Sequence, residues 1–127
     1  MNDYFAEVTD TLANIEQWFA GTEDKTVLTR LLARFSPQFS MIAPNGATLD
    51  FAGLNALFET LGGARPGLCI ELSEWHNIDQ HAGGASVSYR ELQSDASGVL
   101  NDRRATAVFE RQPSGALLWR HLHETFC

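Results

Sequence analysis

Residues 99–125 read VLNDRRATAVFERQPSGALLWRHLHET and contain two runs with the composition of β-strands. The runs, 99–111 and 116–125, are separated by a turn that contains Pro, Ser and Gly. Short connections of this kind typically join neighbouring antiparallel strands. The stretch therefore predicts a long β-hairpin.

Two further strand-like runs precede this hairpin. Residues 68–78 lead to a turn near Gly83-Gly84, and residues 85–93 lead to a loop over 95–98. Because all of the connections between successive runs are short, the four runs predict an antiparallel meander.

The earlier part of the sequence has helical periodicity. Apolar residues recur at intervals of three and four over 3–20, and Gly21 is a natural helix stop. Shorter helices are predicted over 24–34 and 50–61, and an Asn-Gly pair at 45–46 predicts a tight hairpin between them. Three helices, a small hairpin and a four-stranded meander indicate an α+β fold.

Length and charge restrict the class of protein. The chain has 127 residues, 44% of them hydrophobic, which is the size of one ordinary domain. The formal net charge of −7 opposes binding to nucleic acid or to an anionic membrane, because phosphate binding needs clustered Lys and Arg. No apolar run approaches the roughly 18 residues of a membrane-spanning helix. We therefore expect neither a nucleic-acid nor a membrane partner.

The N-terminal residues and the cysteines indicate the compartment. Residues 1–10, MNDYFAEVTD, lack the basic and apolar regions of a signal peptide. Cys69 lies in an apolar run and Cys127 is the last residue, so a disulfide scaffold is not expected. These features predict a cytoplasmic protein.

Several sequence motifs, together with the order of the predicted helices and strands, resemble the nuclear-transport-factor-2-like superfamily. Within that superfamily they resemble the SnoaL-like group. The resemblance lies in VSYRELQ (residues 87–93), RRATAVFER (103–111) and GALLWRHLHET (115–125), with Trp18-Phe19 at the end of the first helix and Phe58 ahead of a glycine pair. It covers essentially the whole chain and implies a single domain over 1–127.

The resemblance implies a cone-shaped fold. Three N-terminal helices would pack on a strongly curved antiparallel sheet, a cystatin-like α+β roll with an internal cavity, and homodimers would form through the outer face of the sheet. The superfamily includes isomerases, polyketide cyclases, dehydratases, epoxide hydrolases and non-catalytic binding modules, so the fold alone leaves the function open.

Alternation along residues 85–93 predicts which side chains face the cavity. Ala85, Val87 and Tyr89 share one face, and Glu91 and Gln93 continue it. A carboxylate facing a cavity has its pKa raised by desolvation, so Glu91 is a candidate base and Tyr89 a candidate donor to an oxyanion. Alternatively, Glu91 lies at the cavity mouth or a bulge turns it outward.

The sequence does not decide which face of the last strand points inward, because both faces carry large apolar residues. His121 and His123 alternate with Trp119, and the resemblance favours the face of Trp119 and His123 as inward. The histidines could form a structural pair, contact a ligand or transfer protons. They could also bind a metal together with Glu91, but no zinc-type spacing supports this and we expect neither metal nor cofactor. Arg104 is predicted to pair across strands with Glu91 or Glu124.

These residues define a candidate site. The catalytic candidates are Glu91, His123 and Tyr89, and the ligand-binding candidates are Trp18, Phe58, Tyr89, Glu91, Trp119, His121 and His123.

The predicted function is a homodimeric domain that binds a small, largely apolar molecule in its cone. One alternative is an isomerase, cyclase or dehydratase that transfers protons on a carbonyl compound. Another is an assembly domain whose main role is dimerisation. The inward helix residues are almost all apolar, so the catalytic pairs of the family cannot be placed residue by residue.

Overall fold

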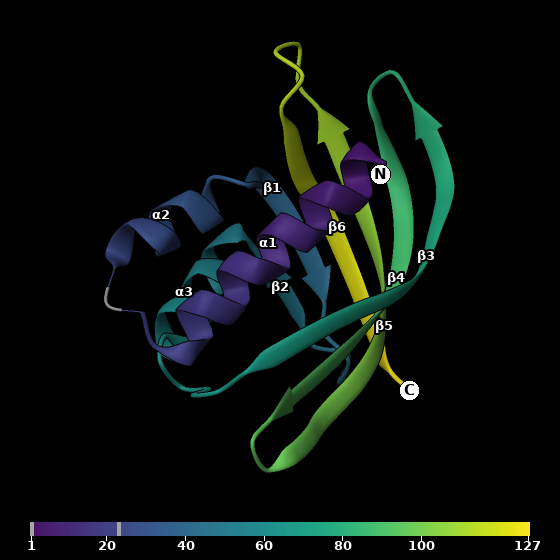
Figure 1. Cartoon of the computed structure of the whole chain (residues 1–127). Helices are drawn as coiled ribbons and strands as arrows, with labels where there is room; N and C mark the ends of the chain where they lie inside the picture. The colour runs from purple at the N-terminus through teal and green to yellow at the C-terminus, as the bar shows by residue number, and fades with distance from the viewer. Residues whose placement is uncertain (1, 23) are drawn as a thin grey trace.

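The computed structural model describes residues 2–22 and 24–127. Figure 1 shows three helices gathered on one side of a strongly curved sheet, as the α+β prediction requires. No helix in the described part of the chain is long and apolar enough to cross a membrane. In chain order the elements are α1 (Asp3–Ala20), α2 (Lys25–Leu32), β1 (Phe35–Ile42), β2 (Thr48–Asp50), α3 (Phe51–Leu61), β3 (Cys69–His81), β4 (Gly84–Asp95), β5 (Gly98–Arg111) and β6 (Leu117–Phe126).

Local signals in the sequence set the ends of the helices. The Asn2 side chain accepts the backbone N–H of Tyr4 at 2.7 Å, which caps the start of α1. The helix ends at Gly21, whose φ of 111° lies in the left-handed region that glycine adopts without a steric penalty. The side chains of Asp24 and Asp50 cap α2 and α3 in the same way.

The sheet is mixed, which corrects the prediction of an antiparallel sheet. Its strand order is β2-β1-β6-β5-β4-β3, and every neighbouring pair is antiparallel except β1 and β6. The last strand returns beside β1 and runs parallel to it, pairing Phe35 with Trp119 and Ile42 with His123. Local periodicity predicts a strand and its sequential neighbour, but not this distant partner.

The core lies between the helices and the concave face of the sheet. Trp119 is 1% exposed, and its indole N–H donates to the Thr11 hydroxyl of α1 at 3.1 Å. The same region holds an ion pair between Glu7 of α1 and Arg34, at 2.8 Å. These contacts fix α1 against β6 and the end of α2.

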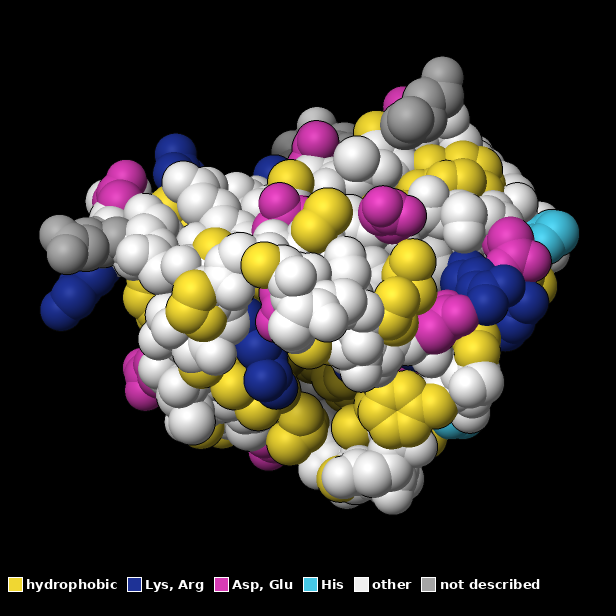
Figure 2. All heavy atoms as spheres, turned by 60° about the horizontal axis from the view of Figure 1, so that its bottom comes forward, with side chains coloured by type: hydrophobic (Ala, Val, Ile, Leu, Met, Phe, Trp, Pro, Cys, Tyr) yellow, Lys and Arg dark blue, Asp and Glu magenta, His cyan; other side chains and the backbone are white. Residues whose placement is uncertain are grey.

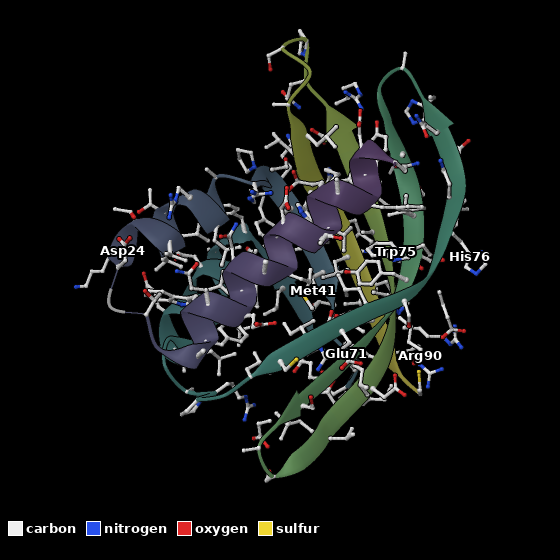
Figure 3. The ribbon with its side chains drawn as sticks, in the orientation of Figure 1. Asp24, Met41, Glu71, Trp75, His76 and Arg90 are labelled. Atoms are coloured by element: carbon white, nitrogen blue, oxygen red, sulfur yellow. The ribbon has the colours of Figure 1, made fainter. Side chains whose placement is uncertain are left out.

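An irregularity in β3 turns one large side chain inward. The register shifts between Ser73 and His76, and Glu74 has a positive φ of 55°. Figure 3 shows Trp75 on the helix side of the sheet and His76 on the other side. Trp75 packs against Tyr89, with ring centroids 5.6 Å apart, and so closes one edge of the core.

Candidate functional site: a pocket with a carboxylate wall

A pocket of about 180 Å³ lies between the helices and the inner face of the sheet. Figure 2 shows the lower face of the molecule in Figure 1, where hydrophobic side chains gather around a recess beside basic side chains. The helices give the pocket an apolar wall whose main members are Leu12, Ile15, Phe19, Leu54, Phe58 and Leu61. These are the apolar stripes of α1 and α3, which amphipathic helices turn toward a core.

The opposite wall is polar and comes from three adjacent strands. One row of hydrogen bonds runs across it. The Gln93 amide donates to Glu91 Oε2 at 2.5 Å, and Asn101 Nδ2 donates to Gln93 Oε1 at 3.0 Å. Arg103 Nε donates to Asn101 Oδ1 at 2.9 Å, and Arg103 Nη1 donates to Glu124 Oε1 at 3.1 Å. All five side chains line the pocket.

Both carboxyl groups on this wall are removed from water. Glu91 is 3% exposed and Glu124 is 6% exposed. Burial raises the pKa of Glu124 to about 7, with Arg103 opposing the rise and the charge of Glu91 adding to it. Burial also raises the pKa of Glu91, against the hydrogen bond from Gln93. Either group can therefore hold a proton at a pH where an ordinary glutamate is ionised.

The register of the strands explains why these groups meet. In β4 and β5, Glu91 is opposite Arg103. Ala105 of β5 pairs with Tyr89 on one side and Glu124 on the other. Burial raises the pKa of the Tyr89 hydroxyl well above its usual range, and the charge of Glu91 adds to the rise.

The histidines lie outside this pocket, which corrects the expected inward face of His123. The β5–β6 register shifts after the Phe109–Trp119 pair, so that Val108 pairs with His121 and Arg120 is an extra residue in β6. This bulge reverses the alternation after Trp119, because one added residue exchanges the two faces of a strand. Leu122 and Glu124 consequently face the pocket.

The structure places both histidines on the outer side of the sheet. His121 Nδ1 is 2.7 Å from the Ser40 hydroxyl, and His123 is exposed. They are thus on the opposite side from Glu91, which contradicts the alternative of a metal site formed by these three residues. The described residues include no group of three or more His, Cys, Asp or Glu side chains that could hold a metal ion.

Of the other candidate residues, all but one line the pocket. Phe58, Tyr89, Glu91 and Trp119 line the pocket, whereas Trp18 is not among its lining residues. The Trp18 indole instead donates to the backbone carbonyl of Phe58 at 2.7 Å. The roles predicted for the pocket-lining candidates stay predictions.

The arginine on the polar wall differs from the one that the sequence suggested. Arg104 pairs with Glu74 at 3.3 Å, and its neighbour Arg103 pairs with Glu124. Alternation could have identified Arg103, because it continues the inward face of Ala105 and Ala107. Glu124 could not have been found this way, since its orientation depends on the bulge at Arg120.

Three helices closing the concave face of a curved sheet, with a pocket between the layers, define a cystatin-like α+β cone. The solved structure of an NTF-2-like protein of unknown function from Pseudomonas aeruginosa is 43% identical to this chain, covers 98% of both chains and has a TM-score of 0.93. The chain therefore belongs to the nuclear-transport-factor-2-like family, which confirms the resemblance in its sequence. No family model and no curated protein matches the chain.

More distant structures share the fold. The protein Aln2 from a Streptomyces species is 18% identical, with 99% of this chain and 92% of Aln2 covered and a TM-score of 0.73. The CaMKII hub homology domain of Chlamydomonas reinhardtii is 15% identical, with 98% and 96% covered and a TM-score of 0.76. At these identities the likeness concerns the fold alone.

Proposed function

We propose that this protein is a homodimeric domain that binds one small, predominantly apolar molecule in its pocket. The observation that carries the proposal is the pocket itself, about 180 Å³ in volume, with an apolar wall from α1 and α3. An apolar cavity of about 150 Å³ is known to bind benzene. The ligand is therefore about the size of one ring with a short substituent, and its polar end lies against the sheet.

The dimer is proposed to form through the outer face of the sheet. Half-buried apolar residues of β4 and β5, Leu92 and Val108, lie on that face among polar side chains. A mixed apolar and polar surface of this kind is typical of protein interfaces. Chains of the same fold include the association domain of C. elegans CaMKII.

Proton transfer on a carbonyl compound is a second candidate function. It is favoured by the Glu91–Glu124 pair, because a carboxyl group with a pKa of about 7 can both accept and donate a proton at neutral pH. In this reading Glu124 takes the place expected for His123, and the Tyr89 hydroxyl is a donor. Glu124→Gln and Glu91→Gln would each abolish turnover of a substrate, whereas unchanged turnover in both variants would exclude this mechanism.

Native mass spectrometry of the freshly purified protein tests the binding function. We expect a dimer that carries one small molecule per chain, which collisional activation releases. Leu122→Phe narrows the pocket and should remove the extra mass. Leu118→Phe, on the same strand directly before Trp119 and not among the pocket-lining residues, should keep it. A dimer without extra mass that is also not stabilised by any ring-sized apolar compound contradicts the binding function. A monomer contradicts the dimer.

A further inference from the structure

We propose that the polar end of the pocket binds an ammonium group, so that the ligand class is a ring-sized apolar primary amine. The ammonium would lie between the carboxylates of Glu91 and Glu124, with the ring against the wall formed by α1 and α3. This inference rests on the proposed binding function and adds the charge and the polar group of the ligand.

The hydrogen bonds of the polar wall leave two acceptors open. Oε2 of Glu91 accepts from Gln93, and Oε1 of Glu124 accepts from Arg103. The second oxygen of each carboxylate has no hydrogen-bond partner among the described residues. A carboxylate only accepts hydrogen bonds once it is ionised, so above the pKa of Glu124 the group that fills this space has to donate. A primary ammonium carries three donors and no acceptor.

The charges of the wall favour a cation over an anion. Two carboxylates face one guanidinium, Arg103, so the wall has one excess negative charge when both acids are ionised. The lining residues from α1 and α3 carry no charge. Tyr89 is neutral, as any tyrosine is well below about pH 10, and burial raises its pKa further. Arg65, in the connection from α3 to β3, is the other basic lining residue and is exposed. A buried excess charge is costly unless it is paired, and a bound ammonium pairs it.

Aromatic side chains also line the pocket. Phe35, Phe58 and Trp119 all line the pocket, and Phe35 packs against both other rings, with centroids 6.0 and 5.6 Å away. The faces of aromatic rings attract cations, most strongly where water is excluded. The same rings provide apolar contact for the body of the ligand.

Protonation of Glu124 competes with the amine for the same negative charge. The pKa of Glu124 is about 7 in the free protein, and the amine needs Glu124 ionised. The ionised fraction rises about tenfold between about pH 6 and about pH 8, so the apparent affinity should rise by about the same factor. A neutral ligand of the same shape should show no such rise.

Isothermal titration calorimetry with three probes of similar shape tests the inference. The probes are 2-phenylethylamine, 2-phenylethanol and phenylacetate, titrated into the intact protein at about pH 6 and about pH 8. At the higher pH we expect the amine to bind at least about tenfold more tightly than the alcohol, and phenylacetate to bind most weakly. Glu124→Gln should remove the pH dependence and most of the preference for the amine.

Further variants separate a specific effect from a general one. Glu91→Gln should also weaken amine binding, and it serves if Glu124→Gln does not fold. Glu74→Gln, whose side chain lies outside the pocket and pairs with Arg90 and Arg104, should bind all three probes as the unmodified protein does. If the alcohol binds as tightly as the amine, the inference is wrong and the binding function stands. If none of the three probes binds, the inference is wrong; the binding function is wrong as well if the protein also purifies without extra mass and no ring-sized apolar compound stabilises it.

Discussion

We expect the folded protein to lose stability as the pH rises from about pH 5 to about pH 8, because Glu124 binds its proton more tightly in the folded state. Its pKa is raised from 4.5 to about 7 by burial. Most carboxylates that form ion pairs have a lowered pKa, so their contribution to stability increases as the pH rises. The perturbation that isolates the effect is Glu124→Gln, which keeps the shape of the side chain and removes its titration.

The sign and size of the effect follow from the two pKa values. Below pH 4.5, Glu124 is protonated in both the folded and the unfolded state. Its contribution to the free energy of unfolding is then fully present. Between 4.5 and about 7, the folded state holds a proton that the unfolded state has lost, so each pH unit lowers the free energy of unfolding by about 1.4 kcal/mol. The total loss is about 3 kcal/mol, a large share of the 5–15 kcal/mol that is typical of a domain.

Urea denaturation at several pH values between about 5 and about 8 measures this loss directly. The unmodified protein should lose about 3 kcal/mol across the range, or somewhat more, since burial also raises the pKa of Glu91. Glu124→Gln should remove the contribution of Glu124 and retain only the pH dependence due to Glu91. The substitution leaves the charge of Arg103 unpaired, but that cost is independent of pH and does not affect the slope.

A matched control excludes a general effect of removing one negative charge. Glu74→Gln removes a partly exposed carboxylate whose pKa lies below its usual range, so the loss between pH 5 and 8 should persist in this variant. If the unmodified protein and Glu124→Gln show the same slope, then Glu124 is already ionised in the folded protein, and the reasoning from its burial is wrong.

Two backbone and packing contacts give further predictions. Gly84→Ala should destabilise the protein by about 2 kcal/mol or more, because a Cβ there would lie 2.0 Å from the carbonyl oxygen of Phe109, whereas Gly83→Ala meets only the His81 ring at 3.3 Å and should change little. Equal thermal midpoints for the two variants would refute this. Trp18→Phe removes the hydrogen bond to the carbonyl of Phe58 and should cost about 1 kcal/mol in urea denaturation, and an unchanged midpoint would contradict it.

Much of the fold could be predicted from the sequence because its signals are local. The cap at Asp24, the stop at Gly21 and the Asn45-Gly46 turn each act within a few residues, and each lies at an element boundary in the structure. The φ of 86° at Gly46 shows why glycine is needed in that turn. The meander could be predicted equally well, because short loops between successive strands leave few alternatives to antiparallel pairing.

The parallel pairing of β1 with β6 had no local signal. The two strands are separated by most of the chain, and the side-chain pattern of β1 is the same whichever strand lies beside it. Only the hydrophobic partners on the inner face reveal it, such as Phe35, whose ring stacks on Trp119 at 5.6 Å. Such contacts depend on the whole sheet and cannot be inferred from alternation in one strand.

The identity of the acids and bases in the pocket depends on one extra residue in β6. A regular strand would turn His121 and His123 inward with Trp119, and the pocket would then contain imidazoles in place of the Glu124 carboxyl. The bulge disrupts the ladder locally, but Arg120 compensates by donating to the backbone carbonyl of Gln38 and pairing with Glu110 at 3.4 Å.

Strand β1, which lies beside β6, is also irregular next to the bulge at Arg120. Between the pairs that join Phe35 to Trp119 and Ser40 to His121, β1 advances by more residues than β6 does. Pro37 lies in this segment, and within a sheet proline is confined to edges, strand starts and bulges because it cannot donate to the ladder. The pairing of β1 with β2 begins only at Ser40, so Pro37 lies where β1 has β6 alone beside it and where the register with β6 breaks. Pro37 could not reveal that the adjoining strand bulges too, and it is this second bulge that turns Glu124 toward Arg103.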